Sequence, residues 1–202
     1  MILAAALLAG AAAPAVAAAP ALPAAASAPL AERVTDIASR FCVDILSRAL
    51  PVPAAGPDEQ RVFARYGLTP GVPDAAMQAL GRAGVGLIAR ATLASGDAAN
   101  GAFVVALGGA AGETCRVIVY RAAAAAGLIQ RTGGAMTVPA RGWKALPAPP
   151  QPPAGVRLSF LRRDAAGRPF LANLIAPRTT GPLALVAHVA AVPPNVTLPQ
   201  GL

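Results

Sequence analysis

The chain has only two cysteines, and they fall in segments of different predicted secondary structure. Cys42 lies in residues 31–50, where apolar residues recur at three- and four-residue steps, the spacing of one buried helix face. Cys115 begins the apolar run 115–120, which predicts a strand. A disulfide between them would therefore pin the first helix onto a sheet. Closing a loop of about 74 residues would stabilise the fold by roughly 4 to 5 kcal/mol on the chain-entropy model.

The N-terminal segment predicts that the chain is exported. The first 31 residues carry no charged side chain, and residues 2–13 form an unbroken apolar run, typical of the core of a signal peptide. Spanning a bilayer takes roughly 20 apolar residues, so this run is too short to do so. Small residues favour cleavage after Ala26, with Ala17 as the other candidate. No basic stretch precedes the run, which is atypical of a signal, so an uncleaved low-complexity arm is the alternative.

Export bears on the cysteines and on the domain boundaries. In the periplasm or outside the cell, an even number of cysteines is more often bridged than free, so we expect the Cys42–Cys115 disulfide. Two separately buried thiols are the alternative, and nothing nearby marks either thiol as activated for catalysis. With residues 1–26 as signal peptide, 27–202 suits one domain without a transmembrane span. A Pro-rich connector is expected at 146–155 and an extended tail at 193–202.

The remaining pattern predicts an α+β fold. Its expected form is an antiparallel sheet of five or six strands, made of a three-strand meander, a crossing helix and three more strands, with the N-terminal helix packed on it. Both faces of the last strand are apolar, so it should be central and covered on both sides. A tight hairpin turn is expected at 164–167. The predicted strands are 85–93, 102–107, 115–120, 156–162, 169–175 and 183–192, and the helices after the first are 57–67, 74–80 and 121–132.

Composition excludes several kinds of site. One histidine and two cysteines cannot supply a four-ligand zinc site, and no metal or other cofactor is expected. The only lysine, Lys144, is not in a phosphate-binding loop, and no Gly-x-Ser-x-Gly motif of a hydrolase nucleophile occurs. A net charge of +8 would suit nucleic acid. Export and the lack of an aromatic-rich basic strand argue against that partner.

His188 is the one candidate for chemistry. A histidine in a central strand can act as a general base, or it can be a neutral core residue. Catalysis would require a carboxylate partner, and the nine acidic residues are scattered along the chain. We therefore assign no catalytic residue and keep a periplasmic hydrolase that uses His188 and a carboxylate as the alternative function.

Three arginines crowd the predicted 164–167 hairpin: Arg162, Arg163 and Arg168. Arginine forks recognise phosphate and carboxylate groups in pairs, so this tip is a candidate anion-binding site for lipid head groups or an acidic partner. A solvated tip is the alternative. The sequence thus favours a non-catalytic binding or interaction protein that is periplasmic or secreted.

Overall fold

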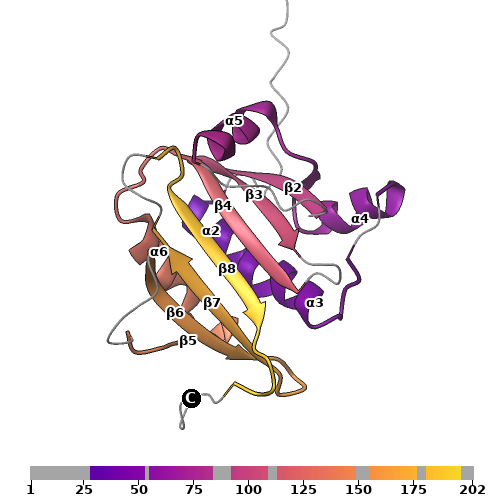
Figure 1. Ribbon diagram of the computed structural model, residues 1–202, viewed down its shortest axis with the longest axis vertical. Coiled ribbons are helices and arrows are strands. Elements are labelled where there is room, and N and C mark those ends of the chain that lie inside the picture. The colour runs from indigo at the N-terminus through magenta and orange to yellow at the C-terminus, as the bar shows by residue number, and fades with distance from the viewer. Residues whose placement is uncertain are drawn as a thin grey trace, which may run out of the picture.

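The computed structural model describes residues 28–52, 55–83, 92–108, 113–148, 155–176 and 181–196. Within them, eight strands form one antiparallel sheet in the order β1-β2-β3-β4-β8-β7-β6-β5 (Figure 1). The predicted signal peptide lies outside the described residues, as do 149–154 of the Pro-rich connector and 197–202 of the tail. The strands are β1 (Thr69–Pro70), β2 (Thr92–Ala98), β3 (Gly101–Gly108), β4 (Thr114–Ala122), β5 (Lys144–Ala145), β6 (Val156–Arg163), β7 (Pro169–Ile175) and β8 (Leu185–Ala191).

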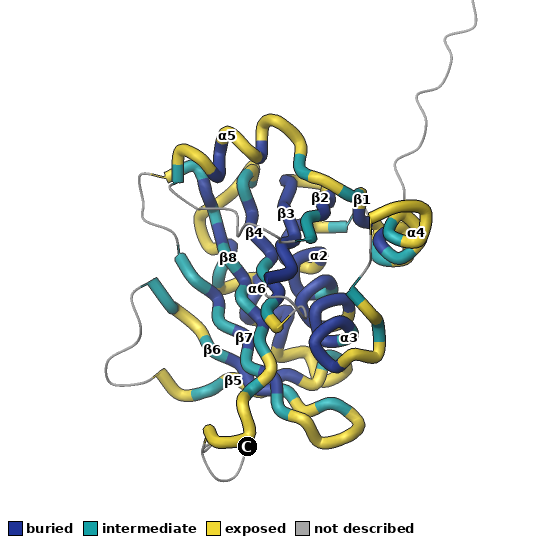
Figure 2. The backbone as a smooth tube through the Cα atoms, turned by 45° about the vertical axis from the view of Figure 1, so that its right-hand side comes forward, coloured by how far each residue is buried: buried dark blue, intermediate teal, exposed yellow. Residues whose placement is uncertain are grey.

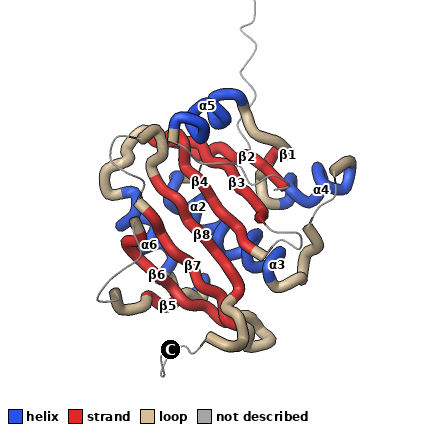
Figure 3. The backbone as a smooth tube through the Cα atoms, in the orientation of Figure 1, coloured by secondary structure: helices blue, strands red, loops and turns tan. Residues whose placement is uncertain are grey.

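The predicted first helix is confirmed over most of its length, but it ends at Leu46 instead of residue 50, and its middle is π-helical. It is continuous through α2 (Leu30–Asp36), η1 (Ile37–Cys42) and α3 (Val43–Leu46). We call this whole element the long helix. Together with α6 (Leu128–Met136) it lies behind the sheet in the view of Figure 3. None of the helices in the described part of the chain is long and apolar enough to cross a bilayer.

Two short helices follow, as predicted. They are α4 (Pro57–Arg65), which lies at the β1 edge of the sheet, and α5 (Asp74–Arg82), which lies at one end of the sheet. In α4, Pro57 sets the first turn, and the two acidic residues after it suit the positive end of the helix dipole. The α5 residue Leu80 packs on Ile118 and Leu183, on the sheet face opposite the long helix.

The main core lies between the long helix and the sheet. Val34, Ile37, Phe41 and Ile45 are fully buried, as their three- and four-residue spacing predicts. They pack against alternate residues of the strands, because only every second side chain points to the same sheet face. Buried backbone accordingly follows the long helix and the central strands (Figure 2).

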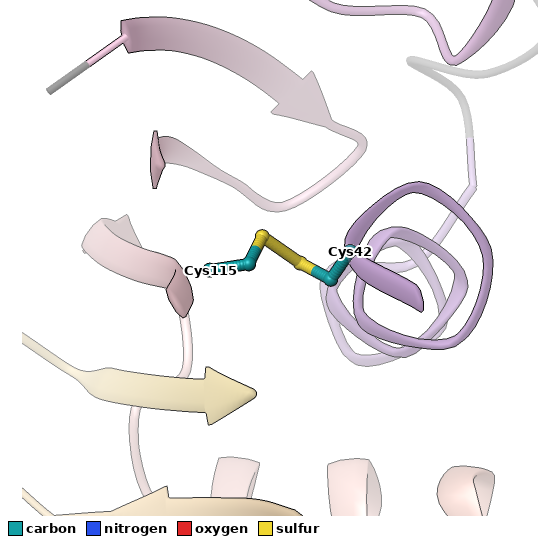
Figure 4. Close-up of a disulfide and its surroundings, with 2 residues drawn as sticks. All are labelled: Cys42 and Cys115. Carbon is teal, nitrogen blue, oxygen red and sulfur yellow. A yellow bond between two sulfur atoms is a disulfide. The ribbon is translucent and has the colours of Figure 1, made fainter. Parts of the chain in front are cut away.

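The expected disulfide is present. Cys42 in η1 and Cys115 in β4 are bonded, and both are fully buried (Figure 4). The bond joins the middle of the long helix to a central strand. The prediction that it pins this helix to the sheet is confirmed.

The sheet is larger than the five or six strands expected. The additional strands, β1 and β5, have two residues each and pair with β2 and β6 at opposite edges. Two residues are too few to show the alternation by which a strand is recognised in a sequence. Short edge strands also leave few unpaired backbone groups open to another chain.

The helix predicted at 121–132 is wrong in its position. β4 continues to Ala122, and α6 begins only at Leu128. Gly133, the residue directly after the predicted helix, lies inside α6. A Cβ there would lie 2.6 Å from Cδ1 of Leu158 in β6. The glycine therefore serves a close approach of the helix to the sheet and does not mark a helix end.

The first predicted meander strand, 85–93, falls mostly on residues that lie outside the description. Its described end, 92–93, belongs to β2, which continues to Ala98, five residues past the predicted end. The turn to β3 is only Ala99 and Asn100, since Ala98 pairs with Gly101. Gly96 in β2 lies opposite Phe103, where a Cβ would be 2.5 Å from the ring. Its missing side chain makes room for a core phenylalanine.

β8 is the central strand that was predicted, between β4 and β7. On its inner face Leu185, Ala187 and Val189 are fully buried. On its other face Val186 and His188 are only half-buried. The strand was expected to be covered on both faces, and the structure covers only the inner face completely.

Candidate functional site

A cleft lined by charged side chains opens between the long helix and α4, with a volume of about 450 Å³. Its walls come from the first half of the long helix, the C-terminal end of α4, and the short 3-10 helix η2 (Pro139–Arg141). We call it the arginine cleft. Its charged lining residues are Arg33, Arg40, Arg65, Arg141, Glu32 and Asp36.

Aromatic packing places α4 against the long helix. The ring of Phe41 lies 5.7 Å from that of Phe63 and 5.0 Å from that of Tyr66, in tilted and edge-on arrangements. Such aromatic pairs stabilise beyond the burial of their area. Phe41 faces the core from the helix that carries Arg33 and Arg40, so the same helix supplies both the anchor for α4 and the charged wall.

A hydrogen bond adds to this anchor. The Tyr66 hydroxyl donates to Oδ2 of Asp44 at 2.8 Å. Burial, together with this bond to Asp44, raises the pKa of Tyr66 to about 12. The phenol therefore remains a hydrogen-bond donor throughout the neutral range, and it holds α4 to the long helix there.

Arg33 is the most unusual residue of the cleft because it is a charged side chain with only 5% of its surface exposed. One terminal nitrogen donates to the carbonyl oxygens of Tyr66 at 2.9 Å and Gly67 at 3.2 Å. These carbonyls lie at the end of α4, where a helix leaves its last acceptors unpaired. The guanidinium also lies over the ring of Phe103, 5.9 Å from its centroid.

The bonding of Arg33 is incomplete. Its other terminal nitrogen is 3.8 Å from Oδ2 of Asp36, and its Nε has no hydrogen-bond partner among the described residues. Burial lowers the pKa of Arg33, an effect that the nearby Asp36 charge opposes. Burying a guanidinium with an unused donor costs free energy, so this arrangement is maintained against a penalty.

The cleft carries more positive than negative charge. Asp36 lies 3.7 Å from Arg40, and Glu32 forms a 2.5 Å ion pair with Arg141. Four arginines and two carboxylates thus leave a formal charge of +2 on the lining. Arg65 is exposed and forms no ion pair within the described ranges. The cleft can therefore attract an anion and offer it guanidinium donors.

The structure does not bring the three arginines predicted at the hairpin together. Arg162 points toward the long helix, where it donates to the carbonyl oxygen of Ser39, and burial lowers its pKa. Ser39 lies in the π-helical segment η1. Nε1 of Trp143 donates to Oγ of the same serine at 2.8 Å. Arg162 is thus a structural contact, and it does not reach the hairpin tip.

Arg163 and Arg168 are exposed on the two sides of the turn, as expected. Asp164 organises this turn: its Oδ1 accepts the backbone N–H groups of Ala166 and Arg168, both at 2.9 Å. Its Oδ2 lies 2.8 Å from Nε of Arg168. The predicted tight turn at 164–167 is confirmed, with a carboxylate at its centre.

His188 lies on the sheet face that the long helix does not cover. The strand register pairs it with Arg116 on β4 and Asn173 on β7. Asn173 in turn is hydrogen-bonded to Ser159, its Oδ1 2.7 Å from Oγ of the serine. The positions paired with His188 thus hold a cation and an amide instead of the carboxylate that a general base requires.

We expect His188 to make the protein less stable in mild acid. Burial, aided by the Arg116 charge, lowers the pKa of His188 below its ordinary value near 6.5. The unfolded chain therefore binds more protons than the folded one, so stability is present above pH 6.5 and is lost as pH falls through the folded pKa. Urea unfolding measured from about pH 8 to about pH 5 should show the free energy of unfolding falling with pH. In a His188→Gln variant this free energy should fall less steeply with pH. An unchanged dependence on pH would contradict the lowered pKa of His188.

Comparisons with protein-family models, with curated proteins and with solved structures found no match to this chain. No group of three or more potential metal ligands occurs in the described ranges. The arginine cleft was missed in the sequence because its residues come from three separate segments. Arg33 and Arg40 lie largely away from the apolar positions in the helical pattern, and only the position of α4 reveals that Arg33 is covered.

Proposed function

We propose that the protein is an exported, non-catalytic binding protein that holds a small anionic ligand in the arginine cleft. The observation that carries this proposal is the buried Arg33 in the wall of a cleft where four arginines face two carboxylates. Charged groups that are buried in a cleft are candidates for function. A carboxylate or phosphate ligand fits this lining, because guanidinium groups bind both in paired hydrogen bonds.

The supports around the cleft favour a preformed site. The disulfide fixes the long helix at Cys42, and the contacts of Phe41 and Tyr66 fix α4. Ligand sites are usually formed before the ligand arrives, because a rigid wall reduces the ordering cost of binding. The cleft volume of about 450 Å³ suits a small organic anion.

We test the cleft with Arg65→Gln, which removes a guanidinium that has no ion pair in the described structure. Calorimetric titrations with inorganic phosphate and with citrate should show that the variant binds at least about tenfold more weakly than the wild type. The reason is that a charge-assisted hydrogen bond contributes roughly 1.5 to 3 kcal/mol. The Nε–H signal of Arg33 in an NMR spectrum should shift on binding in the wild type.

Arg61→Gln is the matched control, since Arg61 is on the same helix, is exposed, and lies outside the cleft lining. It changes the net charge equally and should bind both anions like the wild type. Equal weakening by both variants would mean a nonspecific effect of charge. No binding of either anion up to millimolar concentration would reject the proposal.

Export to the periplasm or the medium is part of the proposal. It rests on the uncharged apolar N-terminus and on the disulfide, a bond typical of oxidising compartments. We expect protein recovered from the periplasm or medium to lack about 26 N-terminal residues and to show no free thiol before reduction. Intact mass before and after alkylation measures both. A full-length mass with two labelled thiols would contradict export.

A further inference from the structure

A second cavity, of about 680 Å³, lies at the hairpin end of the sheet, between the β6–β7 turn and the chain after β8. These two segments run side by side because the Val192 N–H donates to the Pro169 carbonyl at 2.9 Å (Figure 1). We call the cavity the hairpin groove. It shares no lining residue with the arginine cleft.

The groove is apolar over most of its lining. Phe170 and Leu46 line it and are themselves buried, 1% and 9% exposed, and Val192 and three prolines continue the apolar lining. Val196, at the outer end, leaves 49% of its surface in water. Covering such exposed apolar surface is favourable because it removes that surface from water. The groove therefore suits an apolar chain.

Two arginines make one part of this lining cationic. Arg168 shares its charge with Asp164, and the same carboxylate accepts two backbone N–H groups. Arg163 donates only to the neutral carbonyl of Gly167, at 3.1 Å, so no carboxylate of the hairpin offsets its charge. Hydrogen bonds in the turn thus keep both guanidinium groups beside the groove. The two positive charges exceed the single negative charge of Asp164.

We propose that the hairpin groove binds one molecule of an anionic amphiphile, a single apolar chain with a carboxylate or phosphate head. The head would meet Arg163 and Arg168, and the chain would cover Val192, Pro194 and Val196. Apolar lining with a few placed polar groups is typical of small-molecule sites. A concave groove accommodates one chain, whereas a bilayer surface would need a flat or convex face.

The test uses dodecanoate below its micellar concentration, with calorimetry on the full chain. Dodecyl maltoside keeps the chain and removes the charge, and acetate keeps the charge and removes the chain. Dodecanoate should bind at least about tenfold more tightly than either, since each half of the ligand then lacks one set of contacts. Equal affinity for dodecanoate and dodecyl maltoside would overturn the role of the arginines.

Variants locate the binding. The double variant Arg163→Gln, Arg168→Gln should weaken dodecanoate about tenfold and leave dodecyl maltoside unchanged. The double variant also removes the Asp164–Arg168 pair and can disturb the turn. The single variant Arg163→Gln retains that pair and should still weaken the binding of dodecanoate. Val196→Ser should weaken both ligands. Arg157→Gln, an exposed arginine at the opposite end of β6, is the matched control and should change neither.

Two further outcomes would contradict binding of an amphiphile in the hairpin groove. Binding to phosphatidylglycerol vesicles without binding of dodecanoate would indicate a membrane surface contact and no groove site. Loss of dodecanoate binding in Arg65→Gln, with no loss in the hairpin variants, would place the amphiphile in the arginine cleft. The two sites share no lining residue. A failure of dodecanoate to bind in the hairpin groove would therefore not contradict anion binding in the arginine cleft.

Discussion

Replacement of Cys42 and Cys115 by alanine is expected to lower the free energy of unfolding by about 4.5 kcal/mol on the chain-entropy model. The bond closes a loop with a sequence separation of 73 residues, so its removal frees a large part of the unfolded chain. Alanine is chosen because both positions are fully buried and a serine would place a hydroxyl in the core. Urea unfolding of the oxidised wild type and the double variant measures the difference.

The unfolded state of the variant should also be more expanded, so its free energy of unfolding should fall more steeply with urea concentration. Reduced wild type is the matched control, since it has no cross-link but keeps both sulfur atoms, and it should unfold close to the double variant. A double variant as stable as the oxidised protein would mean that the cross-link adds nothing to the packing of the long helix on the sheet.

Phe41→Ala is expected to cost about 3 to 5 kcal/mol and to abolish anion binding by the arginine cleft. The side chain is fully buried, and its ring is the contact that places Phe63 and Tyr66 of the α4 region against the long helix. Without it, the two walls of the cleft lose their shared anchor. Phe41→Leu, which leaves a smaller void, should show a smaller loss of both stability and phosphate or citrate binding.

Phe160→Ala is the matched control for this loss of function. Phe160 is equally buried but belongs to β6, away from the cleft lining. It should lose stability within the same range and still bind anions at temperatures where it remains folded. If Phe41→Ala and Phe160→Ala lose anion binding to the same extent, α4 placement is not what shapes the site.

Features whose cause is local were predictable from the sequence. The apolar spacing of residues 31–50 is a property of the helix itself, so the long helix and its buried face were expected correctly. The alternation in β7 and the residues 164–167 of the hairpin turn are likewise short-range patterns. The two cysteines were assigned to each other because the chain holds no third one.

Features whose cause lies in a distant segment were decided only by the tertiary structure. Gly133 lies inside α6 and faces β6, where Leu158 occupies the space that a side chain would need. β1 and β5 are strands only because longer neighbours pair with them. Arg33 is a surface residue in the helical pattern, and it becomes a buried donor because α4 brings its terminal carbonyls to it. A pattern along the chain records the preference of each residue for its own secondary structure, whereas burial and hydrogen bonding depend on which other segment lies across from it.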